Sequence, residues 1–281
     1  DDPVADDGSI DGVIEAVVAM ARQINCRPIF YQISPRFIPS FLDNGFRLYK
    51  LGEEAVVDLE TFSLDGKARR GLRGSHNRAE RDGLTFDIRQ PPHDPAFLDT
   101  LRAISDEWLA DKGGVEKDFS VGRFSDAYIG RFPVAVVSLA GTPVAFANLL
   151  VTDTRAMATI DLMRHRDDAP TSVMEFLFVE IMLALKADGF AAFSLGLAPL
   201  SGFETMRRKR LWEHSAQLVY EHGNRFYSFK GLRAFKDKFK PEWVPRYAAA
   251  YSTVDFVAGL ADATALINAP SKPAESGDDG P

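Results

Sequence analysis

The chain has 281 residues, 46% of them hydrophobic, so it can bury one large core or two modest ones. Its formal net charge of −7 gives no overall indication of a nucleic-acid partner, and its single cysteine, Cys26, excludes an internal disulfide and fits a reducing compartment. No apolar run approaches the ~20 residues that span a bilayer, and the acidic start does not resemble a signal peptide, so we expect a soluble domain.

The first 66 residues predict a small lobe of helices and strands. Apolar residues at helical spacing behind Ser9 predict a helix over residues 10–24. The other expected elements are a strand at 28–33, a short helix at 35–42, and strands at 46–51 and 55–59 on either side of Gly52 and Glu53. Because the lobe has few strands, its sheet is expected to be incomplete or shared with the rest of the chain.

The stretch 67–83 is strongly basic and predicts a helix with few apolar residues to bury. Helical spacing gathers its polar side chains near one side: Lys67, Arg70, Asn77 and Arg81, with Arg73 and Arg78 close by. Gly71 and Gly74 each cost about 1 kcal/mol of helix stability relative to alanine. Two interpretations stay open: a helix that approaches a phosphate backbone closely, or a solvated connecting helix.

From Leu84 onward strands and helices alternate. The expected order is a strand at 84–89, helices at 94–112 and 122–130, a hairpin of strands at 133–139 and 144–151, a strand at 156–163, a helix at 173–187, a strand at 190–195, a further helix, a strand at 243–251 and a helix at 255–267. The helix at 173–187 is apolar almost all round, so we expect it to be buried against a sheet. The order is that of the GNAT-type acyltransferase fold, an α/β fold with a mixed sheet, which is an analogy of fold alone.

Asp161 and Arg164 stand at the end of the apolar strand at 156–163. Charges there are costly unless they are paired, exposed or used. One interpretation is a structural ion pair at a strand terminus. The other is a ligand-binding pair at the mouth of the sheet, where loops after parallel strands form sites.

Two further basic runs follow. The first is Arg207, Arg208, Lys209 and Arg210, next to Trp212. The second places five cations among aromatic residues: Lys230, Arg233, Lys236, Lys238 and Lys240. Interleaved aromatics and cations suit base stacking and phosphate binding, but they equally suit snorkelling side chains on an amphipathic helix.

Several motifs, in order over most of residues 28–251, carry a specific resemblance. They are FYQIS at 30–34, KLGEEA at 50–55, KARRGLR at 67–73 with NRAER at 77–81, DLMR at 161–164, MEFLF at 174–178, SLGLAPLSG at 194–202 and GLRAFKDKFKP at 231–241. Together they resemble the cytosolic C-terminal domain of the bacterial aminoacyl-phosphatidylglycerol synthases, the MprF family.

The resemblance implies tandem GNAT-like lobes and a division of the chain. The implied parts are an N-terminal lobe at 1–66 that is expected to be incomplete, a basic linker helix at 67–83, a catalytic lobe at 84–268 and a disordered tail at 269–281. It also implies transfer of an amino acid from aminoacyl-tRNA to the glycerol hydroxyl of phosphatidylglycerol, at the cytoplasmic face of the bacterial inner membrane. Members usually carry an N-terminal transmembrane region, which is not in this sequence.

The loop after the strand at 156–163 differs from the glycine-rich loop with which GNAT enzymes bind acetyl-CoA, and this difference bears on the cofactor. The loop 165–172 lacks the glycines of a pyrophosphate cradle and carries two carboxylates, Asp167 and Asp168, so we do not expect acetyl-CoA. An aminoacyl ester is already activated, so neither ATP nor a metal is expected, and no Cys/His metal spacing is visible. His165 is the nearest candidate for a general base, but a lone loop histidine is usually incidental.

The resemblance and the chemistry together suggest site residues. Asp161 is the first candidate to bind the α-amino group, with Glu204 second, and Arg164 would anchor Asp161 or a phosphate. Lys236 or Lys238 would face the lipid phosphate or the oxyanion, and spacing from Glu204 favours Lys238. The residues expected to meet tRNA or lipid phosphates are Lys67, Arg70, Arg73, Arg78, Arg81, Arg207, Arg208, Lys209, Arg210 and Arg233.

Three questions of function stay open from the sequence. Asp167, Asp168 and Glu204 favour lysine as the transferred amino acid, with alanine as the alternative. A Fem-type transferase would use the same donor but a peptide acceptor. A non-catalytic module would use the basic helix to bind tRNA or an anionic membrane.

Overall fold

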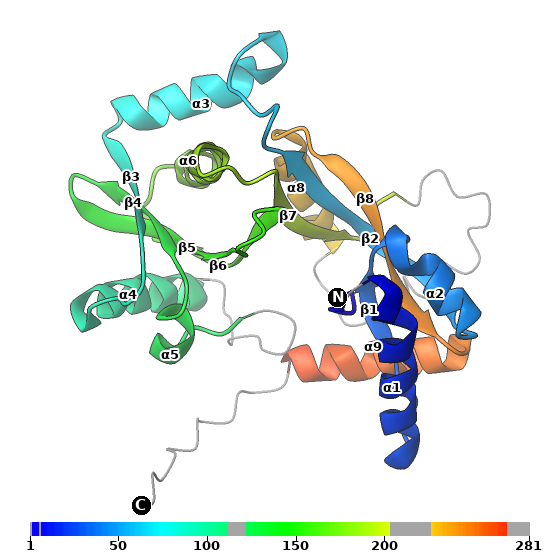
Figure 1. Cartoon of the computed structure of the whole chain (residues 1–281). Helices are drawn as coiled ribbons and strands as arrows, with labels where there is room; N and C mark the ends of the chain where they lie inside the picture. The colour runs from blue at the N-terminus through cyan, green and yellow to red at the C-terminus, as the bar shows by residue number, and fades with distance from the viewer. Residues whose placement is uncertain (1, 6, 112–121, 203–225, 269–281) are drawn as a thin grey trace, which may run out of the picture. The chain divides into compact units, whose positions relative to one another are not determined.

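The computed structural model describes residues 2–5, 7–111, 122–202 and 226–268 (Figure 1). These residues form two compact units. Unit 1 comprises residues 1–63, 154–159 and 186–263, and unit 2 comprises residues 64–153, 160–185 and 264–281. The Glu204 and Arg207–Arg210 predictions fall outside the described residues, as does the tail at 269–281.

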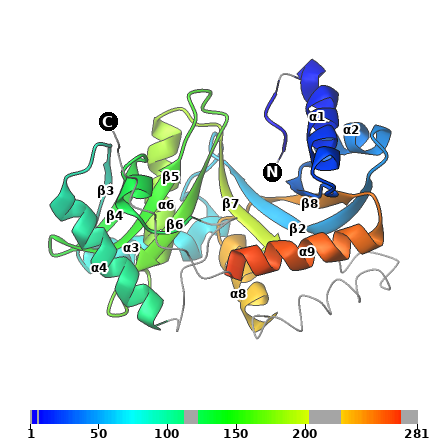
Figure 2. The ribbon, with the colours of Figure 1, turned by 90° about the horizontal axis from the view of Figure 1, so that it is seen from below.

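Four antiparallel strands form most of the sheet of unit 1, and helices lie on both of its faces (Figure 2). Its strands occur in the order β1 (Phe30–Ile33), β8 (Glu242–Ala250), β2 (Arg47–Asp58) and β7 (Ala192–Pro199). Its helices are α1 (Ile10–Gln23), α2 (Ile38–Asp43), α8 (Phe226–Asp237) and most of α9 (Thr253–Asn268), with 3-10 turns η1 (Asp7–Ser9) and η2 (Pro35–Phe37).

The alanines of β8 let helices pack closely on both faces of this sheet. Ala249 lies in the core under α1 and α2, with Ile14 and Phe41. Ala248 and Ala250 point to the other face and share a core with Phe256 of α9. The alternation follows from the period of two in a strand.

β2 corrects the prediction of two strands separated at Gly52 and Glu53. It is one strand, and its register shifts against β8 between Lys50 and Gly52. A Cβ at Gly52 would lie 2.3 Å from the Ala198 carbonyl oxygen, so glycine is needed there for the close approach of β7 and not to end a strand.

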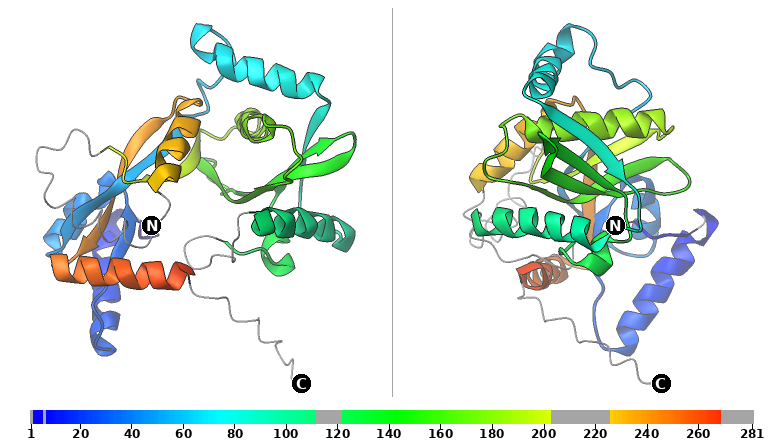
Figure 3. Two further views of the ribbon diagram at one scale, coloured as in Figure 1. Left: turned by 180° about the vertical axis from the view of Figure 1, so that it is seen from behind. Right: turned by 90° about the vertical axis from the view of Figure 1, so that its left-hand side faces the viewer.

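Unit 2 packs helices on both faces of a second group of strands (Figure 3). Its strands are β3 (Leu84–Arg89), β4 (Val134–Leu139), β5 (Thr142–Leu150) and most of β6 (Met157–His165), and its helices are α3 (Arg70–Arg81), α4 (Pro95–Asp111), α5 (Asp126–Ile129) and α6 (Val173–Ala187), with η3 (Lys67–Arg69) before α3. α4 supplies Phe97, Leu101 and Ile104 to a core with Phe146 and Leu162. α6 covers the other face, and eight of its residues are buried, which confirms the expected buried helix.

β6 contributes residues to both units. In unit 1, its residues Met157 to Thr159 pair in parallel with Ala192 to Ser194 of β7, as predicted for a strand-helix-strand crossover. From residue 160 onward β6 belongs to unit 2.

The mixed α/β class and the predicted element order after Leu84 are confirmed. β7 runs on to Pro199 and so absorbs the start of the loop predicted after residue 195. The division into lobes at 66 and 83 stays a prediction, because the two units record packing and each draws on several stretches of chain. Within the ranges described, no helix combines the length and apolarity needed to cross a membrane.

Candidate functional site

Asp161 lies on β6 in unit 2, half-buried, with both carboxylate oxygens engaged. The Gly122 backbone N–H donates to one oxygen at 2.9 Å, and the Tyr128 hydroxyl donates to the other. A Cβ at Gly122 would lie 1.9 Å from the Asp161 carboxylate, so only glycine fits beside it. Burial and the neighbouring carboxylate raise the pKa of Tyr128 to about 12, so this hydroxyl stays a donor at neutral pH.

Arg164 is buried on the same strand but does not form the structural ion pair with Asp161. Its guanidinium lies 4.2 Å from the centre of the Trp108 ring of α4. The contacts of Asp161 among the described residues are those with Gly122 and Tyr128. The carboxylate is therefore oriented by two neutral donors, a backbone N–H and a hydroxyl.

Lys236 of α8 is buried in unit 1, and its ammonium is held by the backbone of β7. Its Nζ donates to the carbonyl oxygens of Gly196 at 2.9 Å and Leu197 at 3.0 Å. Burial lowers the pKa of Lys236 to about 8, and the negative charge of Glu54 acts in the opposite direction. Lys238, by contrast, is exposed with its ammonium 5.5 Å from the Phe235 ring.

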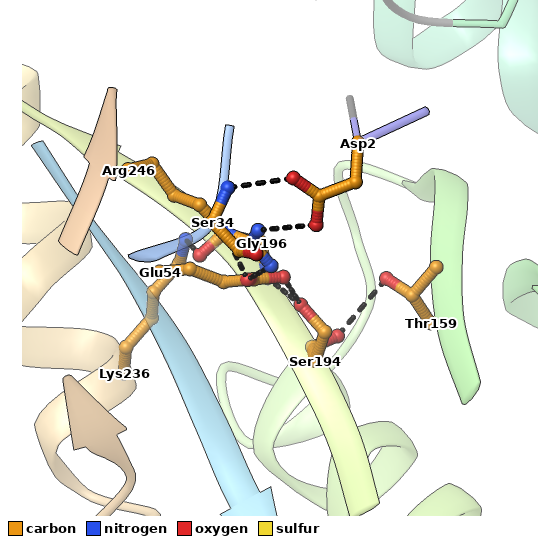
Figure 4. A network of polar contacts seen from close by, with 8 residues as sticks. All are labelled: Asp2, Ser34, Glu54, Thr159, Ser194, Gly196, Lys236 and Arg246. Carbon is orange, nitrogen blue, oxygen red and sulfur yellow. Dashed lines mark hydrogen bonds and ion pairs between the residues drawn. The ribbon is translucent and has the colours of Figure 1, made fainter. Parts of the chain in front are cut away.

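Glu54 of β2 is the centre of a polar network in unit 1 (Figure 4). One of its oxygens accepts from the Ser194 hydroxyl and the other from two nitrogens of Arg246, including Nε at 2.7 Å. Arg246 also donates to Asp2 at 3.4 Å, and Asp2 accepts from the Ser34 N–H at 2.7 Å. A largely buried carboxylate is thus fully paired within this unit.

Glu53, the next residue, organises a second cluster in unit 1. Lys50 and Arg233 each donate to its carboxylate at 2.9 Å. Burial alone raises the pKa of Glu53, but the hydrogen bonds from Arg233 and Lys50 outweigh it and lower that pKa below its ordinary value. Arg233, predicted to bind phosphates, also stacks on Trp243 at 4.1 Å, so it is held on two sides.

Gly202 beside Glu53 gives a first testable prediction. Its φ is +72°, and a Cβ would lie 1.8 Å from a Glu53 oxygen. We expect Gly202→Ala to lower the free energy of unfolding by about 2–3 kcal/mol, measured in urea. Gly45→Ala is the matched control, because its φ is +79° but no atom lies within 4 Å of the added Cβ. Equal losses in both variants would show that the Glu53 contact contributes nothing.

α3 is anchored on one side and exposed on the other. Leu72, His76 and Ala79 are buried, and His76 hydrogen-bonds Glu180 of α6. Most of the predicted cations are exposed: Lys67 in η3 and Arg70, Arg78 and Arg81 in α3. Arg73 instead donates to the backbone carbonyls of Leu64 and Gly66.

The two glycines of α3 lie on its exposed face. A Cβ added at Gly71 or Gly74 would find no atom within 4 Å. By helical spacing Gly74 lies between Arg70 and Arg78, and Gly71 lies next to Arg78 on the basic side. The helix therefore presents bare backbone flanked by cations.

The sequence did not indicate several residues of these sites. Tyr128 and Gly122 carried no signal, because their contact with Asp161 joins distant stretches of chain. Glu54 and Ser194 lie inside the motifs at 50–55 and 194–202, but their spacing along the chain does not predict that they meet. His165 hydrogen-bonds only the neighbouring Arg166 carbonyl oxygen in the contacts described, and the described residues contain no cluster suited to a metal.

The chain matches known proteins along most of its length. A family model described as "Phosphatidylglycerol lysyltransferase, C-terminal" matches residues 1–250. The phosphatidylglycerol lysyltransferase of Bacillus subtilis strain 168 is 41% identical over 249 residues, and that of Staphylococcus aureus strain MRSA252 is 34% identical over 247. Each match covers 88% of this chain and 29% of the relative, so this chain spans under a third of the length of these proteins.

Solved structures of similar proteins point to the same family. The C-terminal domain of an Agrobacterium fabrum protein named as a lysylphosphatidylglycerol synthetase is 45% identical, with a TM-score of 0.87 over 96% of this chain and 82% of that one. L-PGS from Bacillus licheniformis is 40% identical, with a TM-score of 0.84 over 95% and 81%. FemX, at 10% identity and a TM-score of 0.56 over 92% of this chain and 81% of that one, shares the fold alone.

Proposed function

This chain belongs to the family of phosphatidylglycerol lysyltransferase C-terminal domains, and from that premise we propose that it transfers an amino acid from aminoacyl-tRNA to phosphatidylglycerol. Lysine is the favoured amino acid, and alanine is the alternative. The observation that carries the proposal is the family match over residues 1–250, supported by relatives named phosphatidylglycerol lysyltransferase. Because donor tRNA is cytosolic and the acceptor is a lipid, the reaction belongs at the cytoplasmic face of the bacterial inner membrane.

The proposed reaction is a transesterification. The glycerol hydroxyl oxygen attacks the carbonyl carbon of the aminoacyl ester, and the bond from that carbon to the tRNA ribose oxygen breaks. The proton of the glycerol hydroxyl ends on the ribose oxygen. One ester replaces another, so the protein has to hold both substrates and stabilise the oxyanion that forms between the two steps.

Asp161 is proposed to bind the α-ammonium group of the donor amino acid. A carboxylate offers about four acceptor positions, and Gly122 and Tyr128 occupy two of them. The remaining acceptor positions suit the N–H groups of a substrate ammonium. Gly122 and Tyr128 then fix the direction in which Asp161 points.

Lys236 is proposed as the cation that faces the oxyanion or the lipid phosphate. Two of its three N–H groups are directed to β7 carbonyls, which leaves one for a substrate. With a pKa of about 8 the amine is mostly protonated at neutral pH. We prefer it to Lys238, whose earlier support was its spacing from Glu204.

The basic face formed by Lys67 of η3 with Arg70, Arg78 and Arg81 of α3 is proposed to bind the phosphate backbone of tRNA. Phosphates pair with these cations, and the bare backbone at Gly71 and Gly74 allows close approach. No large apolar side chain lies on this face among the described residues, which favours RNA over insertion into a bilayer.

Replacing those glycines should change stability and tRNA affinity in opposite directions. We expect the double variant Gly71→Ala/Gly74→Ala to raise the free energy of unfolding by about 1–2 kcal/mol, because alanine favours helix and has space here. We expect its affinity for tRNA to fall several-fold at fixed salt, because two methyl groups stand between the helix and the phosphates. Urea unfolding and filter binding measure the two effects.

Gly12→Ala in α1 is the control for that experiment. Gly12 is also an exposed helical glycine with no atom within 4 Å of an added Cβ. It should gain stability and keep its tRNA affinity. Unchanged tRNA affinity in the α3 variant would contradict the proposed binding face.

The function itself is tested by supplying both substrates. The protein is incubated with phosphatidylglycerol vesicles and tRNA charged with labelled lysine or, separately, labelled alanine, and the lipid is extracted. Label in a lipid of increased positive charge supports the proposal and identifies the amino acid. Label found only in an added peptide acceptor would indicate a Fem-type transferase, and tRNA binding without any transfer would indicate a binding module.

A further inference from the structure

Glu54 is connected to Lys236 by a continuous series of hydrogen bonds within unit 1 (Figure 4). Lys236 donates to the Gly196 carbonyl oxygen at 2.9 Å, and the N–H of the same glycine donates to the Ser194 hydroxyl oxygen at 3.0 Å. That hydroxyl in turn donates to Glu54. Three residues of β7 and β2 therefore determine where the carbonyl that holds Lys236 lies.

The β7 backbone is irregular at the residues whose carbonyls hold Lys236. Glu54 pairs with Leu197 but Val56 pairs with Ser194, so the register shifts between them. Gly196, inside the shift, has a φ of +80°. A bulge disrupts the ladder locally, and at this bulge two carbonyl oxygens accept from one ammonium.

Arg246 holds Glu54 from the neighbouring strand β8. Two of its guanidinium nitrogens bind the same Glu54 oxygen, and a third nitrogen reaches Asp2. Only 12% of the Glu54 side chain and 14% of the Arg246 side chain are exposed, so water does little to screen the pair. Such a pair keeps a buried negative charge in one place.

We propose that Glu54, Ser194 and Arg246 are positioning residues for Lys236: Ser194 and Arg246 hold Glu54, and together the three set the direction of the Lys236 ammonium group. This rests on the proposed function only in giving Lys236 a part in transfer. Arg246 and Ser194 act through Glu54 and Gly196, and none of the three has to touch a substrate.

Some charged and polar groups near Lys236 face its ammonium, and others are engaged with different partners. Glu54 faces it from β2, and the carbonyl oxygens of Gly196 and Leu197 face it from β7. Arg246 of β8 is directed to Glu54 and Asp2. On α8 itself, Asp237 accepts from the Trp243 indole N–H, Arg233 pairs with Glu53, and Lys238 is exposed.

The test measures the protonation of Lys236 directly. Protein labelled with ¹³C at lysine Cε is titrated by NMR, and the Lys236 signal is assigned by its loss in Lys236→Met. We expect a midpoint near pH 8 in the parent chain. In Glu54→Gln we expect the midpoint to fall by about one pH unit, because the opposing charge is gone. In Glu54→Asp, which keeps the negative charge, the midpoint should return most of the way to that of the parent chain.

Two more variants separate the effect of the Glu54 charge on Lys236 from the orientation of the Lys236 ammonium group. Ser194→Ala keeps the charge, so the Lys236 midpoint should stay, while kcat for transfer falls several-fold at an unchanged KM. Glu53→Gln removes a neighbouring carboxylate that pairs with Lys50 and Arg233, and it should leave the midpoint in place. If Glu54→Gln does not fold, Glu54→Gln/Arg246→Met removes both charges together and is titrated instead.

An unshifted midpoint without Glu54, or the same shift in Glu53→Gln, would overturn the proposal. Failure of the proposed function looks different. If Lys236→Met transfers as fast as the parent chain, Lys236 has no part in the reaction, yet the dependence of its protonation on Glu54 is still measured.

Discussion

Asp161→Asn is expected to lower kcat/KM for aminoacyl transfer by about 100-fold. That factor corresponds to about 2.7 kcal/mol, which is the contribution of a charge-assisted hydrogen bond to a substrate ammonium. Asparagine keeps the shape and can still accept from the Gly122 N–H, so the fold should persist. The measurement is the rate at which label enters lipid, with thermal unfolding recorded on the same sample.

The matched control for Asp161→Asn is Asp87→Asn. Asp87 is an exposed strand carboxylate of unit 2, near Arg89 at 3.6 Å. It should transfer at the parent rate. Tyr128→Phe should give an intermediate loss, since it removes one hydrogen bond that orients the carboxylate but leaves its charge. Full activity of Asp161→Asn would end its assignment as the ammonium-binding group.

Lys236→Met is expected to lower kcat by about 100- to 1,000-fold, the usual loss when a preorganised group that stabilises an oxyanion is removed. Methionine is similar in length and apolar, so it suits a buried position. In the parent chain, transfer should decline as pH rises above about 8, because Lys236 loses its proton there. In Lys236→Met the remaining transfer should not decline in this way above about pH 8.

Lys238→Met identifies which lysine acts. We expect a much smaller loss, because Lys238 is exposed. If Lys238→Met abolishes transfer and Lys236→Met does not, the assignment is reversed. Stability offers a second check on Lys236: its folded pKa lies below the ordinary 10.5, so between about pH 8 and 10.5 the folded chain binds fewer protons than the unfolded one. Its contribution to stability should therefore increase with pH across that interval.

Local patterns were sufficient for most of the fold. The apolar run at 173–187 and the β-capable run before Arg164 predict α6 and β6, because a buried helix or strand is recognisable from the residue types of its own segment. Gly52 shows where such reasoning fails. Glycine in a strand reads as a break, but here it admits the Ala198 carbonyl from another strand, and that neighbour is invisible in the sequence.

The candidate site was predictable only in part. Asp161 stood out because a charge at the end of an apolar strand needs a reason. The choice between Lys236 and Lys238 could not be made, because it depends on which side of α8 packs against β7. The network at Glu54 joins β2, β7 and β8, and no spacing along one segment reports a contact of that kind.

The position of β2 between β7 and β8 has a consequence for how the chain is made. Arg47 pairs with Ala250, and Gly52 pairs with Pro199, so both neighbours of β2 emerge late from the ribosome. At about 5–20 residues per second, residue 250 follows residue 47 by about 10–40 s. The nascent β2 has two unpaired edges until β7 emerges and one until β8 emerges, so we expect its synthesis to depend on a holding chaperone more than that of a protein with local pairing.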